Sequence, residues 1–386
     1  MRRYSSLFFL IMFLIGTDTF LVSPLLPTLS RLFDVSTAVS GWLVSAYAIG
    51  YAGFALVSGP ISDQHDRKQI LLYGLAGFAL STALCGLATT FWLMLLFRLL
   101  AGVCAAFVTP QVWASIPEVV EPKNIVKVMG YATAGLSIAQ LVGIPIGSYL
   151  AAGSWRTPFF VIAVAAVLLM VVCLKTLPTL QSKHTSVGFW QTYKQVVSNH
   201  RAVSYLLAYF VFQTGSFTSI TFISTWFTHD YGLTLTGVGT AMIAIGAGNL
   251  LGSLLSGYYA KKLTFPRTFA YSFMALVLLY IGLTFANSFV VGEIMITIVY
   301  VFNGLIFPLL MTSLQQTVKN ARSTISSLAN AAMYLGETVA GAIGGILFKE
   351  WGFVGIAWFA AIFIAIGAML YWYHGAFKVA DNSRKV

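Results

Sequence analysis

The sequence predicts an all-α membrane protein with twelve transmembrane helices. Of its 386 residues, 58% are hydrophobic and 9% are charged, whereas soluble domains carry about 25% charged residues. Apolar tracts of about 20 residues recur along the whole chain, each long enough to cross a hydrocarbon core about 30 Å thick. Lipid offers the backbone no hydrogen-bond partners, so these tracts are expected to be helices.

The tracts follow one another through short polar connections. The first is too long for a secretory signal and lacks a small-residue cleavage pattern, so we expect it to remain as a helix. In chain order, the twelve tracts cover residues 6–28, 39–60, 69–89, 92–116, 125–151, 157–177, 203–227, 237–259, 268–287, 290–313, 324–348 and 353–373.

The longest polar break divides the chain into two halves. It predicts a cytoplasmic linker, residues 178–201, between an N-terminal six-helix bundle, 1–177, and a C-terminal one, 202–386. A shift of 198 positions aligns three pairs of glycines: Gly59 with Gly257, Gly143 with Gly341, and Gly147 with Gly345. This internal similarity favours two pseudo-symmetric bundles with a solute site between them near the membrane midplane.

Positive charge is distributed unevenly over the connections. The net charge is +11, and with a cytoplasmic N-terminus only Arg31, Arg156 and Lys349 fall on the outer side. Cytoplasmic loops carry the excess of Lys and Arg, so both termini are expected on the cytoplasmic side of the cell membrane. The charge is therefore an orientation signal and does not indicate a nucleic-acid partner.

The sequence predicts neither a cofactor nor a metal. Cys85, Cys104 and Cys173 each stand alone in an apolar tract, without the spacing of a disulfide framework or a metal site. No Gly-rich motif followed by Lys-Ser/Thr is present, so a nucleotide-phosphate site is not expected. Clustered polar groups typical of a membrane enzyme are also missing from the sequence.

The turn after the second tract carries an ordered set of charges. It reads Gly-Pro-Ile-Ser-Asp-Gln-His-Asp-Arg-Lys over residues 59–68. This order resembles the signature loop of the major facilitator superfamily, Gly-x-x-x-Asp-x-x-Gly-Arg-Lys/Arg, with Asp66 in place of the second glycine. The resemblance implies a rocker-switch solute transporter. The four residues that match, and that we expect to form a conformational latch, are Gly59, Asp63, Arg67 and Lys68.

The latch hypothesis rests on the start of the eleventh helix, which lies on the same side of the membrane. The first turn of a helix has unpaired N–H groups and a partial positive charge, so a carboxylate there is favourable by about 0.3–1 kcal/mol. We expect Asp63 to cap that helix and Arg67 to hold Asp63.

The fifth tract contains a second motif, Gly143-Ile144-Pro145-Ile146-Gly147, with Gly135 two turns earlier. A proline inside a helix removes a backbone hydrogen bond and bends the helix. The run resembles the antiporter signature of the superfamily, which implies exchange of solute for protons. This pattern is less typical of solute symporters.

Small residues at four-residue spacing form ladders in three tracts. Small side chains let helices approach closely in lipid, and ordinary tight packing is the alternative explanation. In the superfamily these three helices line the contact between the halves, so we expect the ladders there. They comprise Gly135, Ala139, Gly143, Gly147 and Ala151; Ala244, Gly248, Gly252 and Ser256; and Ala332, Gly336, Ala340 and Gly344.

Three ionisable residues lie well inside apolar tracts: Asp18, Arg98 and Glu337. Such a residue costs roughly 2.5–3.5 kcal/mol on insertion scales, so it is expected to be functional. Arg98 lies about six residues and Asp18 about nine to twelve residues from the same membrane face. At ~1.5 Å per residue these depths differ by a few ångströms, which a long arginine covers. We expect proton coupling at these three residues, with binding of a cationic drug as a second possible role of Glu337. The alternatives are a static ion pair of Asp18 and Arg98 and a structural carboxyl at Glu337.

The sequence around Asp18, Gly-Thr-Asp-Thr-Phe-Leu-Val-Ser-Pro-Leu-Leu-Pro, resembles the first-helix motif of the drug–proton antiporter family. Its likeness is greatest to the branch that exports chloramphenicol-like drugs, sugars and nucleosides. Arg-Leu-Leu-Ala-Gly at 98–102 and Ser-Trp-Arg-Thr-Pro-Phe at 154–159 extend the resemblance over the first half.

A substrate cavity is expected from aromatic and amide side chains of six or more tracts. The alternative is that these side chains face lipid or pack between helices. The candidates are Phe20, Tyr47, Trp113, Tyr131, Gln213, Phe217, Asn249, Asn303 and Phe307.

These features together predict a monomeric, proton-coupled exporter of small amphiphilic compounds such as drugs, and not an enzyme. A metabolite exporter for sugars, nucleosides or amino-acid derivatives is one alternative. A non-transporting membrane sensor or scaffold with the same fold is another, and it requires Asp18 to be dispensable.

Overall fold

The computed structural model describes residues 2–64, 66–121, 124–179, 193–194, 196–318 and 322–374. Over these residues the secondary structure is helical, with no strand. Eleven of the described helices are long and apolar enough to cross a membrane. The predicted all-α membrane class is therefore confirmed.

Within the described residues, the first half of the chain forms eight α-helical segments and one short π-helix. The segments are α1 (Arg2–Leu32), α2 (Thr37–Ser40), α3 (Trp42–Gln64), α4 (Arg67–Leu87), α5 (Phe91–Val119), α6 (Ile125–Ile138), the π-helix η2 (Ala139–Gly143), α7 (Ile144–Gly153) and α8 (Thr157–Thr176). The π-helix ends at Gly143, two residues before Pro145, which cannot donate a hydrogen bond, so the helix of the fifth tract changes type next to this proline. The bend predicted there stays a prediction.

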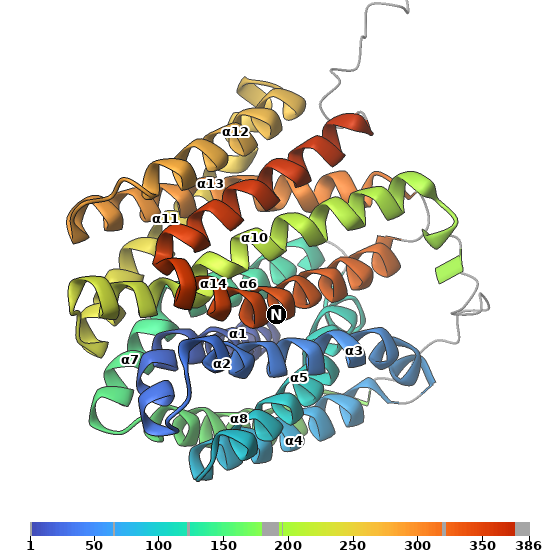
Figure 1. Cartoon of the computed structure of the whole chain (residues 1–386). Helices are drawn as coiled ribbons and strands as arrows, with labels where there is room; N and C mark the ends of the chain where they lie inside the picture. Colours follow the sequence, from blue (N-terminus) through green and yellow to red (C-terminus); the bar gives the residue numbers. More distant parts are fainter. Residues whose placement is uncertain are drawn as a thin grey trace, which may run out of the picture.

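The second half contains α10 (His200–Tyr231), α11 (Leu235–Lys262), α12 (Phe265–Leu283), α13 (Phe289–Gln315) and α14 (Arg322–Tyr373). At 52 residues, α14 is far too long for one crossing of a bilayer. It is interrupted at Gly352, whose φ of 61° and ψ of −156° are not helical. Figure 1 shows α14 doubling back on itself, so it comprises the two last predicted tracts.

Polar side chains begin several of the helices. Asp66 accepts a hydrogen bond from the backbone N–H of Lys68 at the start of α4, which explains the acid at a position where the superfamily pattern has glycine. Thr90, Thr234 and Ser288 cap α5, α11 and α13 in the same way. These short polar residues therefore fix where the membrane segments start.

The helices pack as two groups. In the first half α1 packs on α6, and α4 lies between α5 and α8; in the second, α10 packs on α14 and α11 on α13. Figure 1 shows the blue-to-green helices of one group on one side and most of the yellow-to-red helices on the other. The predicted linker, residues 178–201, falls mostly outside the described residues.

The small-residue ladders do not lie where they were predicted. Gly135 and Gly143 of the fifth tract pack on Phe9 and Thr17 of α1, in the same half. The α11 ladder packs on α13, and the α14 ladder packs on α10. The prediction was wrong because a stripe of small residues indicates close approach without indicating the partner helix. Other glycines of the same helices contact the opposite half: Gly239, Gly246, Gly341 and Gly345.

The contacts between the halves gather toward the end where α1 finishes and α3 begins. Ser45 Oγ donates to the carbonyl of Thr338 over 2.7 Å, three residues into α3. The hydroxyls of Tyr149 and Thr240 are 2.7 Å apart, near the end of α7 and the start of α11. Gly41 lies so close to Gly341 that an added Cβ would be 2.1 Å from its carbonyl oxygen. The two halves are therefore closed against each other at this end.

Candidate functional site

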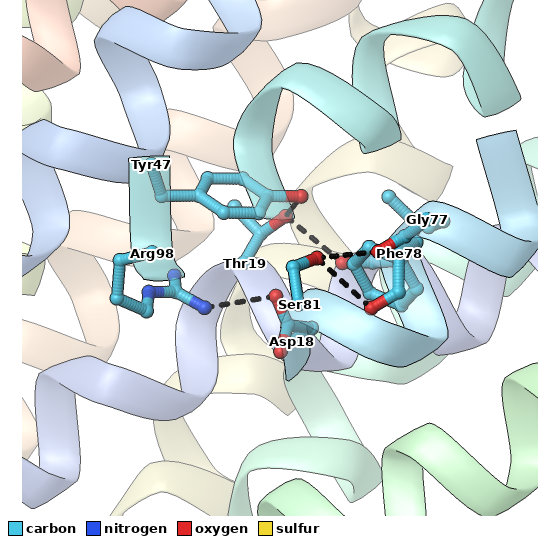
Figure 2. Close-up of polar contacts among 8 residues, drawn as sticks. Asp18, Thr19, Tyr47, Gly77, Phe78, Ser81 and Arg98 are labelled. Carbon is cyan, nitrogen blue, oxygen red and sulfur yellow. Dashed lines mark hydrogen bonds and ion pairs between the residues drawn. The ribbon is translucent and has the colours of Figure 1, made fainter. Parts of the chain in front are cut away.

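A buried ion pair joins α1 and α5. Arg98 Nη1 donates to Asp18 Oδ2 over 2.9 Å, and both residues are fully shielded from solvent. Figure 2 shows the two side chains pointing toward each other from their helices. The contact expected from the depths of the two residues is present, while its part in proton coupling stays a prediction.

Tyr47 of α3 completes the surroundings of the guanidinium. Arg98 Cζ lies 4.4 Å from the centre of the Tyr47 ring, a distance at which the face of the ring attracts a cation. The Tyr47 hydroxyl lies 3.1 Å from Thr19 Oγ1, which also donates to the carbonyl of Ile15. Three helices of the first half thus hold the pair. Tyr47, predicted for the substrate cavity, belongs to this cluster.

The pair leaves several polar atoms without a hydrogen bond. Asp18 Oδ1 and Arg98 Nε and Nη2 are buried and have no hydrogen-bond partner. Buried polar atoms in folded proteins are nearly always hydrogen-bonded, to protein or to water. The site therefore has spare donors and a spare acceptor for a further partner.

Glu337 brings the second half of the chain to this cluster. It lies on α14, is 2% exposed, and its Oε2 has no hydrogen-bond partner. The guanidinium of Arg98 acts on it electrostatically. One turn earlier on α14, Tyr334 stacks on Tyr51 of α3, with ring centroids 3.8 Å apart. Arg98 therefore acts on both carboxyl groups predicted for coupling, Asp18 and Glu337.

Sequence reasoning missed the stacked pair of Tyr51 and Tyr334. Tyr51 follows Tyr47 by four residues and Tyr334 precedes Glu337 by three, so each occupies the same helix face as a predicted site residue. That spacing was available in the sequence. The pairing of the two rings was not, because it depends on which helices of opposite halves meet.

The signature loop is tied to two neighbouring helices of its own half. Arg67 Nε lies 3.1 Å from Glu118 Oε1 on α5. Lys68 Nζ donates to the carbonyls of Leu174 and Leu177, over 2.9 and 2.6 Å, at the end of α8. A cation is favourable there because the last carbonyls of a helix have no partner inside the helix. Neither partner was predicted from the sequence.

Two members of the predicted latch cannot be placed by their contacts. The side chains of residues 59–64, which include Gly59 and Asp63, lie outside the described part of the structure. The same holds for residues 319–323 near the start of α14. The capping of α14 by Asp63 therefore stays a prediction.

The predicted cavity residues fall into several separate places. Phe20 and Phe217 stack across the halves, with centroids 6.5 Å apart. Asn249 donates to Gln140 across the halves, whereas Asn303 accepts from Ser216 within the second half. The remaining four are a buried Gln213 that donates to Tyr209, a half-buried Trp113, and the exposed Tyr131 and Phe307.

One small cavity lies between the halves. It has room for about one water molecule, so it holds no solute in this state. Phe20, Ile144 and Ile220 line it, together with residues of η2, α11 and α13. Of the residues predicted for the substrate site, Phe20 is the one that lines this cavity, and the stacked pair of Phe20 and Phe217 lies at the seam.

Comparison with known proteins identifies this architecture. The model of the Major Facilitator Superfamily matches residues 8–341 and 205–385. The chain belongs to the major facilitator superfamily. It is a multi-pass membrane transporter and not an enzyme. The other members of this superfamily found by the comparisons are transporters as well.

Relatives in this superfamily span nearly the whole chain. The uncharacterized MFS-type transporter YceJ of Bacillus subtilis (strain 168) is 46% identical, over 95% of this chain and 94% of its own length. Multidrug resistance protein 2 of the same organism is 26% identical, over 85% of this chain and 84% of its own. A crystal structure of a D-xylose–proton symporter shares the fold, with a TM-score of 0.79 at 15% identity, covering 100% and 99% of the two chains.

Proposed function

We propose that this transporter is a proton-coupled antiporter that exports small amphiphilic compounds such as drugs by alternating access. The observation that carries the proposal is the buried ion pair of Asp18 and Arg98, next to the seam between the two halves. Two relatives named multidrug resistance proteins favour the same class of substrate. The charge distribution of the connections supports a cell-membrane protein with both termini on the cytoplasmic side.

The ion pair supplies a reversible proton site. A carboxylate inside the membrane is costly unless a cation accompanies it. Protonation of Asp18 removes its charge and releases Arg98, so the contact between α1 and α5 changes with the proton. Deprotonation restores the pair. An acid that switches in this way couples proton binding to the arrangement of the helices around it.

The proton gradient is a sufficient source of energy. Moving one charge across 100 mV provides about 2.3 kcal/mol, and a tenfold concentration ratio requires about 1.4 kcal/mol. One proton per cycle therefore supports a gradient of some tens-fold for a neutral solute, with no nucleotide consumed.

The seam carries the features that a cationic amphiphile needs. Glu337 offers a buried carboxylate oxygen with no hydrogen-bond partner, and Tyr51 and Tyr334 offer aromatic rings beside it. Aromatic faces and a carboxylate together favour organic cations. The latch of Gly59, Asp63, Arg67 and Lys68 is proposed to hold the opposite end of the halves shut in the other state of the cycle.

Counter-transport in proteoliposomes tests the proposal. An imposed pH gradient is expected to drive uptake of a cationic dye into inside-out vesicles, and Asp18→Asn is expected to abolish it. The matched control is Asp230→Asn, which removes an exposed carboxylate at the end of α10 and should leave uptake unchanged. Uphill uptake at the normal rate by Asp18→Asn would refute proton coupling through this residue.

A panel of substrates tests the second part of the proposal. Sugars and nucleosides in the same assay distinguish a metabolite exporter from a drug exporter. Pumping of a sugar but no dye would move the transporter to the metabolite class while leaving the coupling mechanism intact. Pumping of neither solute, with correct folding, would favour a sensor or scaffold.

A further inference from the structure

Glu337 is the one described carboxylate of the second half that Arg98 acts upon. It is buried, it faces the seam, and one of its oxygens has no hydrogen-bond partner. Arg98 has two donor atoms in the same condition, Nε and Nη2. Arg98 thus has two buried donor atoms, and Glu337 one buried acceptor atom, that make no hydrogen bond.

The charges around the pair do not balance if both acids are ionised. The groups that act on Asp18 or Arg98 come from four helices besides α1: Tyr47 of α3, Cys85 of α4, Arg98 of α5 and Glu337 of α14. Among these described groups Arg98 is the cation, facing two carboxyl groups. A second buried carboxylate without a counter-charge is strongly unfavourable in a low-dielectric interior. One of the two acids must therefore be neutral.

We propose that Asp18 and Glu337 share one proton and that Arg98 pairs with whichever of the two is ionised. The inference rests on the proposed function and specifies how the proton site reaches the second half. In the present state Asp18 is ionised and paired, so Glu337 carries the proton. When Asp18 takes up a proton from one side of the membrane, Glu337 releases its own, and the net charge of the cluster does not change.

The arrangement of the guanidinium suits such an exchange. Arg98 Cζ lies over the ring of Tyr47, 4.4 Å from its centre, so a short movement along the ring face keeps the cation–π contact. The helix that carries Tyr47 contacts α14 directly, since Ser45 Oγ donates to the carbonyl of Thr338, next in sequence to Glu337. The helix beside Arg98 and the helix that carries Glu337 are therefore already in contact.

The exchange has a mechanical result. With Asp18 as partner, Arg98 joins two helices of the same half, α1 and α5. With Glu337 as partner, it joins α5 to α14, which belong to different halves. Proton uptake on the first half would thereby change the number of contacts that hold the halves together.

Infrared spectroscopy of the reconstituted full-length protein tests this inference directly, through the C=O absorption of protonated carboxyl groups. We expect Glu337→Gln to remove one such band from the otherwise unchanged protein at neutral pH. We expect Asp18→Asn to remove the same band, because Glu337 then ionises and pairs with Arg98. Persistence of the Glu337 band in Asp18→Asn would overturn the proposal.

A second variant keeps the test decisive if Asp18→Asn does not fold. Arg98→Gln removes the cation, so both acids are expected to be neutral and the absorption to rise about twofold; an unchanged absorption would overturn the proposal. Glu293→Gln is the control, since Glu293 is another carboxyl of a membrane segment, on α13 away from the pair. It should leave the Glu337 band in place.

Transport by the same variants separates this inference from the proposed function. Normal uphill transport by Asp18→Asn would refute the proposed function itself. A normal proton-coupled cycle in Glu337→Gln would refute the shared proton alone and leave Asp18 as the coupling acid. Loss of coupling in both variants, together with the infrared result, would support both.

Discussion

Ser23 Oγ donates to the backbone carbonyl of Thr221 over 2.9 Å, and these two residues are 198 positions apart. The same shift aligns the three glycine pairs of the two halves. Equivalent positions of two repeats meet where the axis that relates the repeats passes between them. The pseudo-twofold axis therefore runs between α1 and α10 at Ser23, one turn from the stacked rings of Phe20 and Phe217.

Removing this hydroxyl should weaken the closed end of the molecule. Ser23→Ala loses hydrogen bonds to the carbonyls of Ile220 and Thr221, a change worth about 1 kcal/mol or roughly fivefold in the ratio of closed to open molecules. Distances between spin labels on the ends of α1 and α10 measure that ratio. Ser272→Ala, which removes a buried hydroxyl bonded within its own helix, should leave the distances unchanged.

A methyl group at Gly41 should separate the halves. Its Cβ would overlap the carbonyl oxygen of Gly341, so the present contact between the α2–α3 junction and α14 could not form. We expect Gly41→Ala to reduce transport at least tenfold and to lengthen the distance between labels on the two helix ends. Gly53→Ala, at a glycine of α3 with open space around it, is the control. Normal transport by Gly41→Ala would show that this close contact is not needed in the cycle.

The sequence was sufficient for the features that depend on one helix at a time. The tracts, the irregular helix next to Pro145 and the depths of Asp18 and Arg98 all follow from composition and spacing along a helix. The partners across helices were not accessible in this way. The glycine ladders were assigned to the wrong neighbours, and the stacking of Tyr51 on Tyr334 was missed, because both depend on how the two halves are turned toward each other.

Lys68 should stabilise the end of α8. Lys68→Gln removes the charged donor from the carbonyls of Leu174 and Leu177, at a cost of about 1–2 kcal/mol to the last turn. Hydrogen exchange of residues 173–177 is expected to become about tenfold faster. Lys349→Gln, at an exposed lysine 3.9 Å from Glu350, should leave that segment unaffected. Unchanged exchange in Lys68→Gln would mean that the helix end is held by its packing alone.

Replacing one member of the buried ion pair should destabilise the protein more than replacing both members. Arg98→Leu leaves the buried carboxyl group of Asp18 without its partner. Loss of one partner of a buried ion pair typically lowers the free energy of unfolding by about 3–5 kcal/mol. The double variant Asp18→Leu with Arg98→Leu buries no charge, so its thermal midpoint in detergent is expected to lie above that of Arg98→Leu. A double variant less stable than the single one would contradict an electrostatic origin for the loss.

The joint at Gly352 has a consequence for how displacement spreads through the second half. A single residue connects the segment of α14 that touches α3 to the segment that packs on α10 through Phe363 and Tyr371. A connection of one residue cannot lengthen when the segment that contacts α3 is displaced. We therefore expect a tilt of the segment before Gly352, which contacts α3, to be transmitted directly to the segment after Gly352.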